Sequence, residues 1–174
     1  LTLEDIFFFS FTCTVPDDCV PTINKIALKD SLLRVPTSWG MFVQYQSNVA
    51  IASIDKTISY GAEISRVTLE FNGQKYSGSI YELPETSTIT EAGVFDVTVT
   101  ITDTRGREAE KSAKVTVVEY ETPKISEQVY RCTEAGEQDN DGTYFAAETN
   151  TSISSCNGKN SATITISYKL TSSG

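Results

Sequence analysis

The sequence predicts an all-β protein that is built from β-sandwich units in tandem. Three observations predict this class: apolar and polar residues alternate along several stretches, turn residues separate those stretches about every ten positions, and one segment is similar to a later one. Because the side chains of a strand point to opposite faces in turn, alternation is typical of a sheet with one buried and one solvated face. We therefore expect two-layer β units with little helix.

The first predicted element is a strand near the N-terminus. Its apolar residues occupy every second position from Phe7 to Val15, and Pro16 with two aspartates follows as a connector. We expect residues 1–19 to be the terminal strand of a preceding unit and the exit from that unit. Ile26–Leu33 is the only segment in which we expect a helical turn.

Residues 93–120 predict one complete β-hairpin. On the buried side of its first arm we expect Phe95, Val97, Val99 and Ile101, and on that of its second arm Ala113, Val115 and Val117. Residues 103–106 supply the turn, in which Gly106 can adopt a positive φ. Thr104–Lys114 contains helix formers but no apolar stripe at helical spacing, so we interpret it as a polar tip that continues into a strand. The hairpin is predicted to be scaffold without catalytic residues.

A repeat divides the chain into units. Pro21 and Pro123 lie 102 positions apart, and each has an isoleucine two positions after it. A second similarity, at an offset of 97, relates Val67, Leu69 and Phe71 to Ile164, Ile166 and Tyr168. Short strands in a unit of about one hundred residues indicate an immunoglobulin-like sandwich. We therefore predict an immunoglobulin-like β-sandwich at residues 20–120 and the N-terminal half of a second one at residues 121–174.

The second predicted unit has no counterpart of the hairpin at residues 93–120. A half sandwich would leave an apolar face and an open strand edge uncovered. Either the chain continues beyond Gly174 or a neighbouring subunit supplies the missing strands, and of these we favour a longer parent protein.

Composition and charge exclude several functions. The 23 acidic and 14 basic residues give a net charge of −9, which repels the phosphates that a nucleic-acid-binding protein must neutralise. The apolar run Ile6–Phe11 is far shorter than the roughly 20 residues that a membrane-spanning helix needs. The chain has no histidine, and so lacks the commonest general base and metal ligand. We expect no catalytic residue, no nucleic-acid partner and no membrane span.

Four cysteines leave the redox state open. Cys13, Cys19, Cys132 and Cys156 could form two disulfides in an exported protein. Cys13 follows the apolar parity of the first strand, so a buried thiol that acts as a small apolar side chain is the alternative.

One loop has the composition of a calcium site. Oxygen-bearing side chains recur between Glu137 and Tyr144, and Asp139 with Asp141 could ligate a hard cation. An EF-hand that began at Asp139 would require an acidic residue at its twelfth position, where Asn150 stands. We therefore interpret Asn140-Asp141-Gly142 as a turn between two strands and assign no metal and no cofactor.

Two further groups of residues could bind a partner. Six aromatic residues could stack against sugar rings, although aromatics in a small sandwich more often pack in the core: Trp39, Phe42, Tyr45, Tyr60, Tyr76 and Tyr81. Arg105 and Arg107 flank Gly106, and we interpret them as the solvated tip of the hairpin rather than as an anion site. The sequence thus assigns no cofactor-binding residue.

Several segments, in order, resemble a family of siphophage minor structural proteins. They are residues 39–49, 59–64, 102–107, 119–125 and 130–132. The resemblance covers residues 20–170 and implies a tail or tail-tip component with tandem immunoglobulin-like units. It implies a non-catalytic virion part, assembled in the host cytoplasm, that acts as a spacer or decoration. Because that cytoplasm is reducing, the resemblance also favours free thiols.

The partners that the resemblance implies are other tail proteins, further copies of the chain in a homo-oligomer, and a host-surface carbohydrate. A bacterial cell-surface adhesin or a carbohydrate-binding accessory module is the alternative, since the same fold serves both functions.

Overall fold

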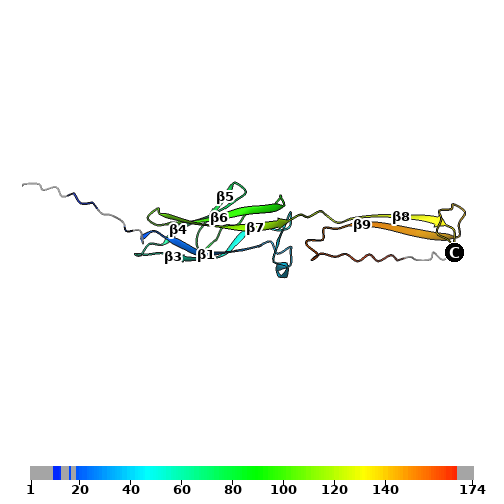
Figure 1. Cartoon of the computed structure of the whole chain (residues 1–174), viewed down its shortest axis with the longest axis horizontal. Helices are drawn as coiled ribbons and strands as arrows, with labels where there is room; N and C mark the ends of the chain where they lie inside the picture. The colour runs from blue at the N-terminus through cyan, green and yellow to red at the C-terminus, as the bar shows by residue number, and fades with distance from the viewer. Residues whose placement is uncertain (1–9, 13–15, 17–18, 168–174) are drawn as a thin grey trace, which may run out of the picture. The chain divides into compact units, whose positions relative to one another are not determined.

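The structure, a computed structural model, describes residues 10–12, 16 and 19–167 of the 174-residue chain. These residues form nine strands and a single-turn 3-10 helix (Figure 1). The strands are β1 (Thr22–Lys29), β2 (Phe42–Val43), β3 (Ala50–Thr57), β4 (Ile64–Phe71), β5 (Gln74–Gly78), β6 (Gly93–Asp103), β7 (Glu108–Val118), β8 (Lys124–Cys132) and β9 (Tyr144–Ser152), and the helix is η2 (Thr37–Trp39). The prediction of an all-β protein is confirmed.

The strands form three sheets. The largest has the order β2-β7-β6-β4-β5, in which β2 runs parallel to β7 and β4 runs antiparallel to β5 and β6. The second contains β1 and β3, and an isolated bridge between Ala50 and Glu85 adds to its β3 side. Short, mainly antiparallel strands that divide between two sheets within about one hundred residues are typical of an immunoglobulin-like sandwich. The predicted immunoglobulin-like β-sandwich is therefore confirmed.

Two compact units interleave along the sequence. The first comprises the described parts of Leu1–Lys29, Val49–Thr86 and Asp96–Lys114, and the second comprises those of Asp30–Asn48, Ser87–Phe95 and Val115–Gly174. The sequence predicts different boundaries, which come from the repeat and give the segments 1–19, 20–120 and 121–174. These boundaries stay a prediction.

The core of the first unit comes from alternate residues of β4 and β6. Val67, Leu69, Val97, Val99 and Ile101 have no exposed surface. Burial of such a side chain contributes roughly 1.5–3 kcal/mol relative to leaving it exposed, so these residues dominate the stability of the unit. The predicted buried face of the first hairpin arm is confirmed over these positions, and Phe95 is half-buried.

The second arm of that hairpin is β7. Ala113 is half-buried, whereas Val115 and Val117 are buried. Between the arms, Gly106 has a φ of 79°, which a residue with a side chain adopts only at a cost. The polar segment after the tip enters the strand at Glu108, so the expectation of a hairpin tip rather than a helix is confirmed.

The helical turn expected at Ile26–Leu33 is wrong. Residues up to Lys29 belong to β1, which pairs antiparallel with β3. The register shifts between Ile23 and Lys25 and between Ala27 and Leu28. The first shift adds Asn24 to β1, and the second adds Ala52 to β3. Ile26, Ala27 and Leu28 are all half-buried, so this part of β1 does not alternate between a buried and an exposed face.

The strands β8 and β9 form a hairpin of their own. Nine residue pairs, from Lys124 with Ser152 to Cys132 with Tyr144, run without a register shift. In the loop between them Asp139 closes a turn, because its Oδ1 accepts the Asp141 N–H at 2.9 Å and its carbonyl accepts the Gly142 N–H at 3.0 Å. The predicted turn between two strands is confirmed.

The second sequence similarity is not reproduced in the structure. Val67, Leu69 and Phe71 are buried in β4, whereas Ile164 and Ile166 lie outside any strand and are exposed. The correspondence fails because a strand forms only against a partner strand, and residues 161–167 have none in the described part of the chain. Tyr168, most of the N-terminal strand expected at residues 1–19, and Cys13 lie outside the described residues.

Candidate interaction site

The β8–β9 hairpin presents an apolar surface to solvent. Because paired residues of an antiparallel sheet share a face, Ile125, Val129, Phe145 and Ala147 lie on the same side. We call these four residues the apolar row. Ile125 is 67% exposed and Val129 is 65% exposed, although side chains of these types are usually buried.

The opposite face of the hairpin also mixes apolar and polar side chains, and it includes Tyr130, Tyr144 and Ala146. Tyr130 donates a hydrogen bond of 2.5 Å from its hydroxyl to Oε1 of Glu148. This bond to the carboxylate, with desolvation and the negative charge of Glu148, raises the pKa of Tyr130.

Backbone edges are also open beside the apolar row. The sheet has two strands in the described part of the chain, so each strand has one edge with no strand beside it. Such edges readily accept another extended segment. Residues 161–167 follow without a strand assignment, and within them Ile164 and Ile166 add exposed apolar surface.

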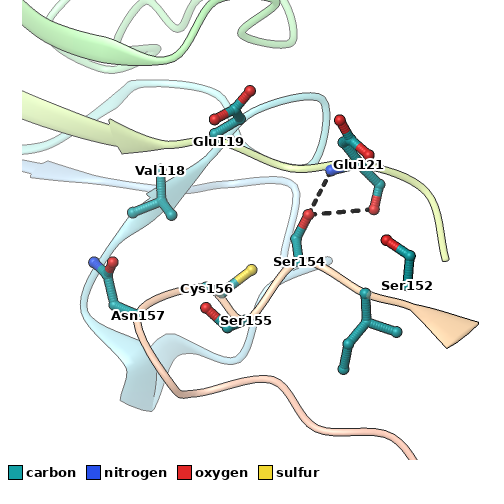
Figure 2. Close-up of a pocket in the computed structure, with 9 residues that line it drawn as sticks. Val118, Glu119, Glu121, Ser152, Ser154, Ser155, Cys156 and Asn157 are labelled. Atoms are coloured by element: carbon teal, nitrogen blue, oxygen red, sulfur yellow. Dashed lines mark hydrogen bonds between the residues drawn. The ribbon is translucent and has the colours of Figure 1, made fainter.

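A cavity of about 360 Å³ lies where the chain enters and leaves this hairpin (Figure 2). Val118, Glu119 and Glu121 line one side, and residues 152–157 line the other. The Ser154 hydroxyl oxygen accepts the Glu121 N–H at 2.6 Å and donates to the Glu121 carbonyl at 3.4 Å. These two bonds hold the entry and exit segments together.

Beside that cavity, Cys156 belongs to a small apolar cluster. Cys156, Val35 and Val43 are its buried members, and Trp39, Met41 and Tyr120 pack against them. Burial raises the pKa of the Cys156 thiol, since an apolar environment disfavours the thiolate. The thiol therefore acts as an apolar packing group and is a poor nucleophile.

The tip of the β6–β7 hairpin contains a buried ion pair. Asp103 is 1% exposed, and its Oδ2 accepts hydrogen bonds from Arg107 Nη2 at 2.8 Å and Nε at 3.0 Å. Its Oδ1 accepts the backbone N–H groups of Arg105 and Arg107. Burial by itself raises the pKa of Asp103, but these hydrogen bonds and the Arg107 charge outweigh it and lower the pKa below the ordinary value of 3.8.

A family model that matches most of the chain shows which protein family the chain belongs to. The family described as "Siphovirus protein of unknown function (DUF859)" matches residues 8–173. The chain belongs to this siphovirus family. The expectation of a siphophage protein, which the sequence resemblance implied, is thereby confirmed.

One solved structure resembles part of this siphovirus protein. It is the crystal structure of the PKD1 domain from the Vibrio cholerae metalloprotease PrtV, with 21% sequence identity and a TM-score of 0.40. The similarity covers 56% of this chain and 96% of that domain. No curated protein sequence matches the chain.

The aromatic residues considered for sugar stacking do not share one unit of the siphovirus protein. Trp39, Phe42 and Tyr45 belong to the second unit. Tyr60, Tyr76 and Tyr81 belong to the first. Trp39 packs against the Cys156 cluster, as the core alternative expected, whereas Tyr81 is 96% exposed.

The other residues that the sequence singled out lie apart from one another in the structure. Asp139 and Asp141 lie in the β8–β9 turn, and no group of three side chains suited to a metal occurs in the part of the chain that the structure describes. Of the two tip arginines, Arg105 bonds the Tyr60 carbonyl and Arg107 pairs with Asp103, so the expected solvated tip is partly structural. Cys132 and Cys156 are free thiols, and both are buried, as is Cys19. Among the described residues, no helix is long and apolar enough to cross a membrane.

Three polar features of the structure did not follow from the sequence. The first is the Asp103–Arg107 ion pair. The second is the buried Asn48, whose backbone N–H donates to Asp30 Oδ1 and whose Oδ1 accepts the Ser31 N–H. The third is the Tyr130–Glu148 hydrogen bond. The sequence does contain a signal for the ion pair: Asp103 stands at the start of a glycine turn, and Arg107 follows four residues later. An aspartate before a turn often accepts the N–H two residues on.

Proposed function

We propose that this siphovirus protein is a non-catalytic structural module of the virion, located in the tail, the tail tip or a fibre. Its role there is that of a spacer or surface decoration. Membership of a siphovirus family is the observation that carries the proposal. A sandwich with a fully buried apolar core and a second, open hairpin in the same chain supports it, because an exposed apolar row suits assembly with neighbours.

The burial of the chemically reactive groups supports a non-catalytic role. The carboxylate with the clearest change in pKa is Asp103, whose oxygens are occupied by Arg107 and by backbone N–H groups. Cys156 has a raised pKa and packs among apolar side chains. Both groups therefore stabilise the fold and are poorly placed to react with a substrate.

The proposal is tested on purified virions. We expect mass spectrometry of gradient-purified particles to detect the chain at a constant stoichiometry, and antibody labelling to mark the tail in electron micrographs. A chain that is abundant in infected cells but absent from purified particles would contradict a structural role. Antibody on the capsid alone would contradict the tail location.

The proposal also includes contact with a carbohydrate on the host surface. Tyr81 supports it, because the tyrosine is 96% exposed in a loop in which Ser79 Oγ accepts the N–H groups of Tyr81 and Glu82. A fixed loop presents the ring at a low entropic cost, and aromatic rings bind through large apolar faces.

The carbohydrate contact has a direct test. We expect the chain to sediment with host cell walls and Tyr81→Ala to weaken that binding several-fold, whereas Tyr45→Ala in the second unit leaves it unchanged. Equal binding of all three proteins would remove Tyr81 from the contact. The alternative of an exported adhesin predicts a disulfide between Cys132 and Cys156 in the native protein, and mass spectrometry without reduction detects it.

A further inference from the structure

Residues 156–158 form a turn with a strained backbone. Cys156, Asn157 and Gly158 have φ values of 47°, 56° and 76°, which is the longest run of positive φ in the described part of the chain. The left-handed region is unfavourable for a residue with a side chain, although asparagine tolerates it better than most. Two residues of this turn carry that cost, so a change that lengthens the turn would relieve it.

Few hydrogen bonds restrain the middle of this turn. The Lys159 N–H closes the turn by donating to the Cys156 carbonyl at 3.2 Å. Among the described residues, neither the Asn157 side chain nor the Gly158 N–H has a hydrogen-bond partner. Both residues are exposed to solvent. The side-chain amide of Asn157 can therefore rotate toward the Gly158 nitrogen without breaking a bond.

An asparagine followed by glycine is the pair in which the side-chain amide reacts most readily with the backbone, because glycine has no Cβ to hinder the approach. The chain contains two such pairs, Asn72-Gly73 and Asn157-Gly158. The first pair forms the tight turn of the β4–β5 hairpin, and paired strand residues hold it on both sides. The second pair has no strand pairing beside it in the described residues, so the fold restrains it less.

We propose that Asn157 is a site of spontaneous deamidation, with water as the only co-reactant. The Gly158 nitrogen attacks Cγ of Asn157, the Cγ–Nδ2 bond breaks, and the proton that the nitrogen loses is balanced by the one that leaves with ammonia. The product is a succinimide ring. Water then opens the ring, at the Asn157 backbone carbonyl to give isoaspartate or at Cγ to give aspartate. The net reaction consumes water and releases ammonia, with no oxidation or reduction.

The isoaspartate product fits the strained turn better than asparagine does. Its backbone runs through Cβ and Cγ, which inserts one more carbon atom before the Gly158 nitrogen. A longer backbone can close the turn without holding every residue in the left-handed region. Relief of strain therefore favours the forward reaction at Asn157, whereas the paired strands beside Asn72 oppose the same change.

Deamidation would also alter the cavity beside the turn. Asn157 lines the cavity of about 360 Å³ together with Glu119 and Glu121 (Figure 2). A third carboxylate there brings like charges together, which disfavours the closed arrangement. The preceding residue, Cys156, is buried in the cluster with Val35, so we expect the reaction to loosen that cluster. This inference goes beyond the proposed function and does not depend on the location in the tail.

Peptide mapping by mass spectrometry tests the reaction on the full-length chain. The protein is incubated at mildly alkaline pH, the replacement of the amide NH2 by a hydroxyl is followed at both pairs, and isoaspartyl methyltransferase is the reagent that detects isoaspartate. We expect Asn157 to convert several-fold faster than Asn72 in the folded protein, and the two to convert at similar rates in denaturant. Equal or faster conversion of Asn72 in the folded protein would overturn the proposal. A difference that persists in denaturant would overturn its structural basis.

Matched glycine variants test the attacking group. A Cβ at Gly158 or at Gly73 meets no neighbouring atom, so we expect both Gly158→Ala and Gly73→Ala to fold, with some strain from the positive φ. Gly158→Ala should slow conversion at Asn157 many-fold and leave Asn72 unchanged, and Gly73→Ala should do the reverse. Conversion at Asn157 that is insensitive to Gly158→Ala would exclude attack by the Gly158 nitrogen.

Fluorescence of the single tryptophan reports the effect on the cluster. Trp39 packs against the buried members of the cluster, so loosening should shift its emission to longer wavelength. We expect the shift to grow with conversion of the unmodified chain. Asn157→Gln should show no shift after the same incubation, because its longer side chain closes the corresponding ring far more slowly. A fully converted chain whose emission matches that of fresh protein would contradict the loosening.

Discussion

The β6–β7 and β8–β9 hairpins have strands of similar length and opposite environments. In β6 three alternate residues have no exposed surface, whereas in β8 the alternate residues Ile125 and Val129 are mostly exposed. Their turns differ too, since Asp103 is buried against Arg107 and Asp139 lies exposed in its loop. The comparison teaches that a hairpin is stabilised by what covers its apolar face, and only weakly by its own backbone bonds.

The largest expected effect comes from two isoleucines, one in the first strand of each hairpin. Ile101→Ala empties a fully buried position of β6 and should lower the free energy of unfolding by about 2–5 kcal/mol. Ile125→Ala in β8 should change it by less than about 0.5 kcal/mol in the monomer. Urea denaturation of both variants measures the difference, and equal losses would mean that the β8 face is covered in solution.

A second test of the comparison measures how stability depends on pH and uses the aspartates in the two hairpin turns. The pKa of Asp103 is lower in the folded chain than the ordinary 3.8, so its contribution to stability is complete above that value. That contribution is lost as the pH falls below 3.8 toward the folded pKa. We expect Asp103→Asn to reduce stability at neutral pH and to flatten the acid limb of a stability profile, while Asp139→Asn leaves both unchanged. An acid limb that is identical in the Asp103 variant would contradict the ion pair.

Two turn glycines should respond differently to a methyl group. A Cβ at Gly142 would collide with the backbone carbonyl of Cys132, which cannot move away as a side chain could. We expect Gly142→Ala to cost about 1–3 kcal/mol and to raise hydrogen exchange throughout β8 and β9. Gly106→Ala meets open space, and only its φ of 79° opposes the change, so we expect about 1 kcal/mol. A greater loss at Gly106 would reverse this assignment.

The smallest effect concerns alkaline pH. The pKa of the Cys156 thiol is raised above 9.0 by burial, so the folded state favours the protonated thiol. Its contribution to stability is complete below pH 9.0 and is lost as the pH rises from there through the folded pKa. Thermal unfolding between pH 8 and 10 should show a decline that Cys156→Ala reduces; the same decline in the variant would exclude the thiol as its source.

Most of the sandwich was predictable from the sequence because its pattern is local. The alternation in residues 95–101 needs no knowledge of distant residues, and the turn at Gly106 separates the two arms. The same logic failed at Ile26–Leu33, where Ile26, Ala27 and Leu28 are all half-buried in β1 and show no period of two. Pairing with a strand some thirty residues away decided the outcome there.

The candidate site was predictable only in outline. A half sandwich with an uncovered face was expected from the missing counterpart of residues 93–120, and it stays a prediction. The exposure of Ile125 and Val129 comes from the structure alone. The burial of Asp103 did not follow, because an aspartate in a turn ordinarily faces water and its guanidinium partner sits four residues on. Nor did the packing of Cys156 with Val35, since the two lie far apart in the sequence.

The accessibility of the Cys156 thiol can report whether the apolar cluster around it is closed or open. A thiol that packs against Val43 is shielded from alkylating reagents as long as that cluster stays closed. Three buried side chains form this cluster, against five with no exposed surface in β4 and β6, so we expect pulling on the β8–β9 end of the chain to separate the cluster first. With the proposed location in the virion, the rate at which a maleimide labels Cys156 in intact particles would report how far this cluster opens there.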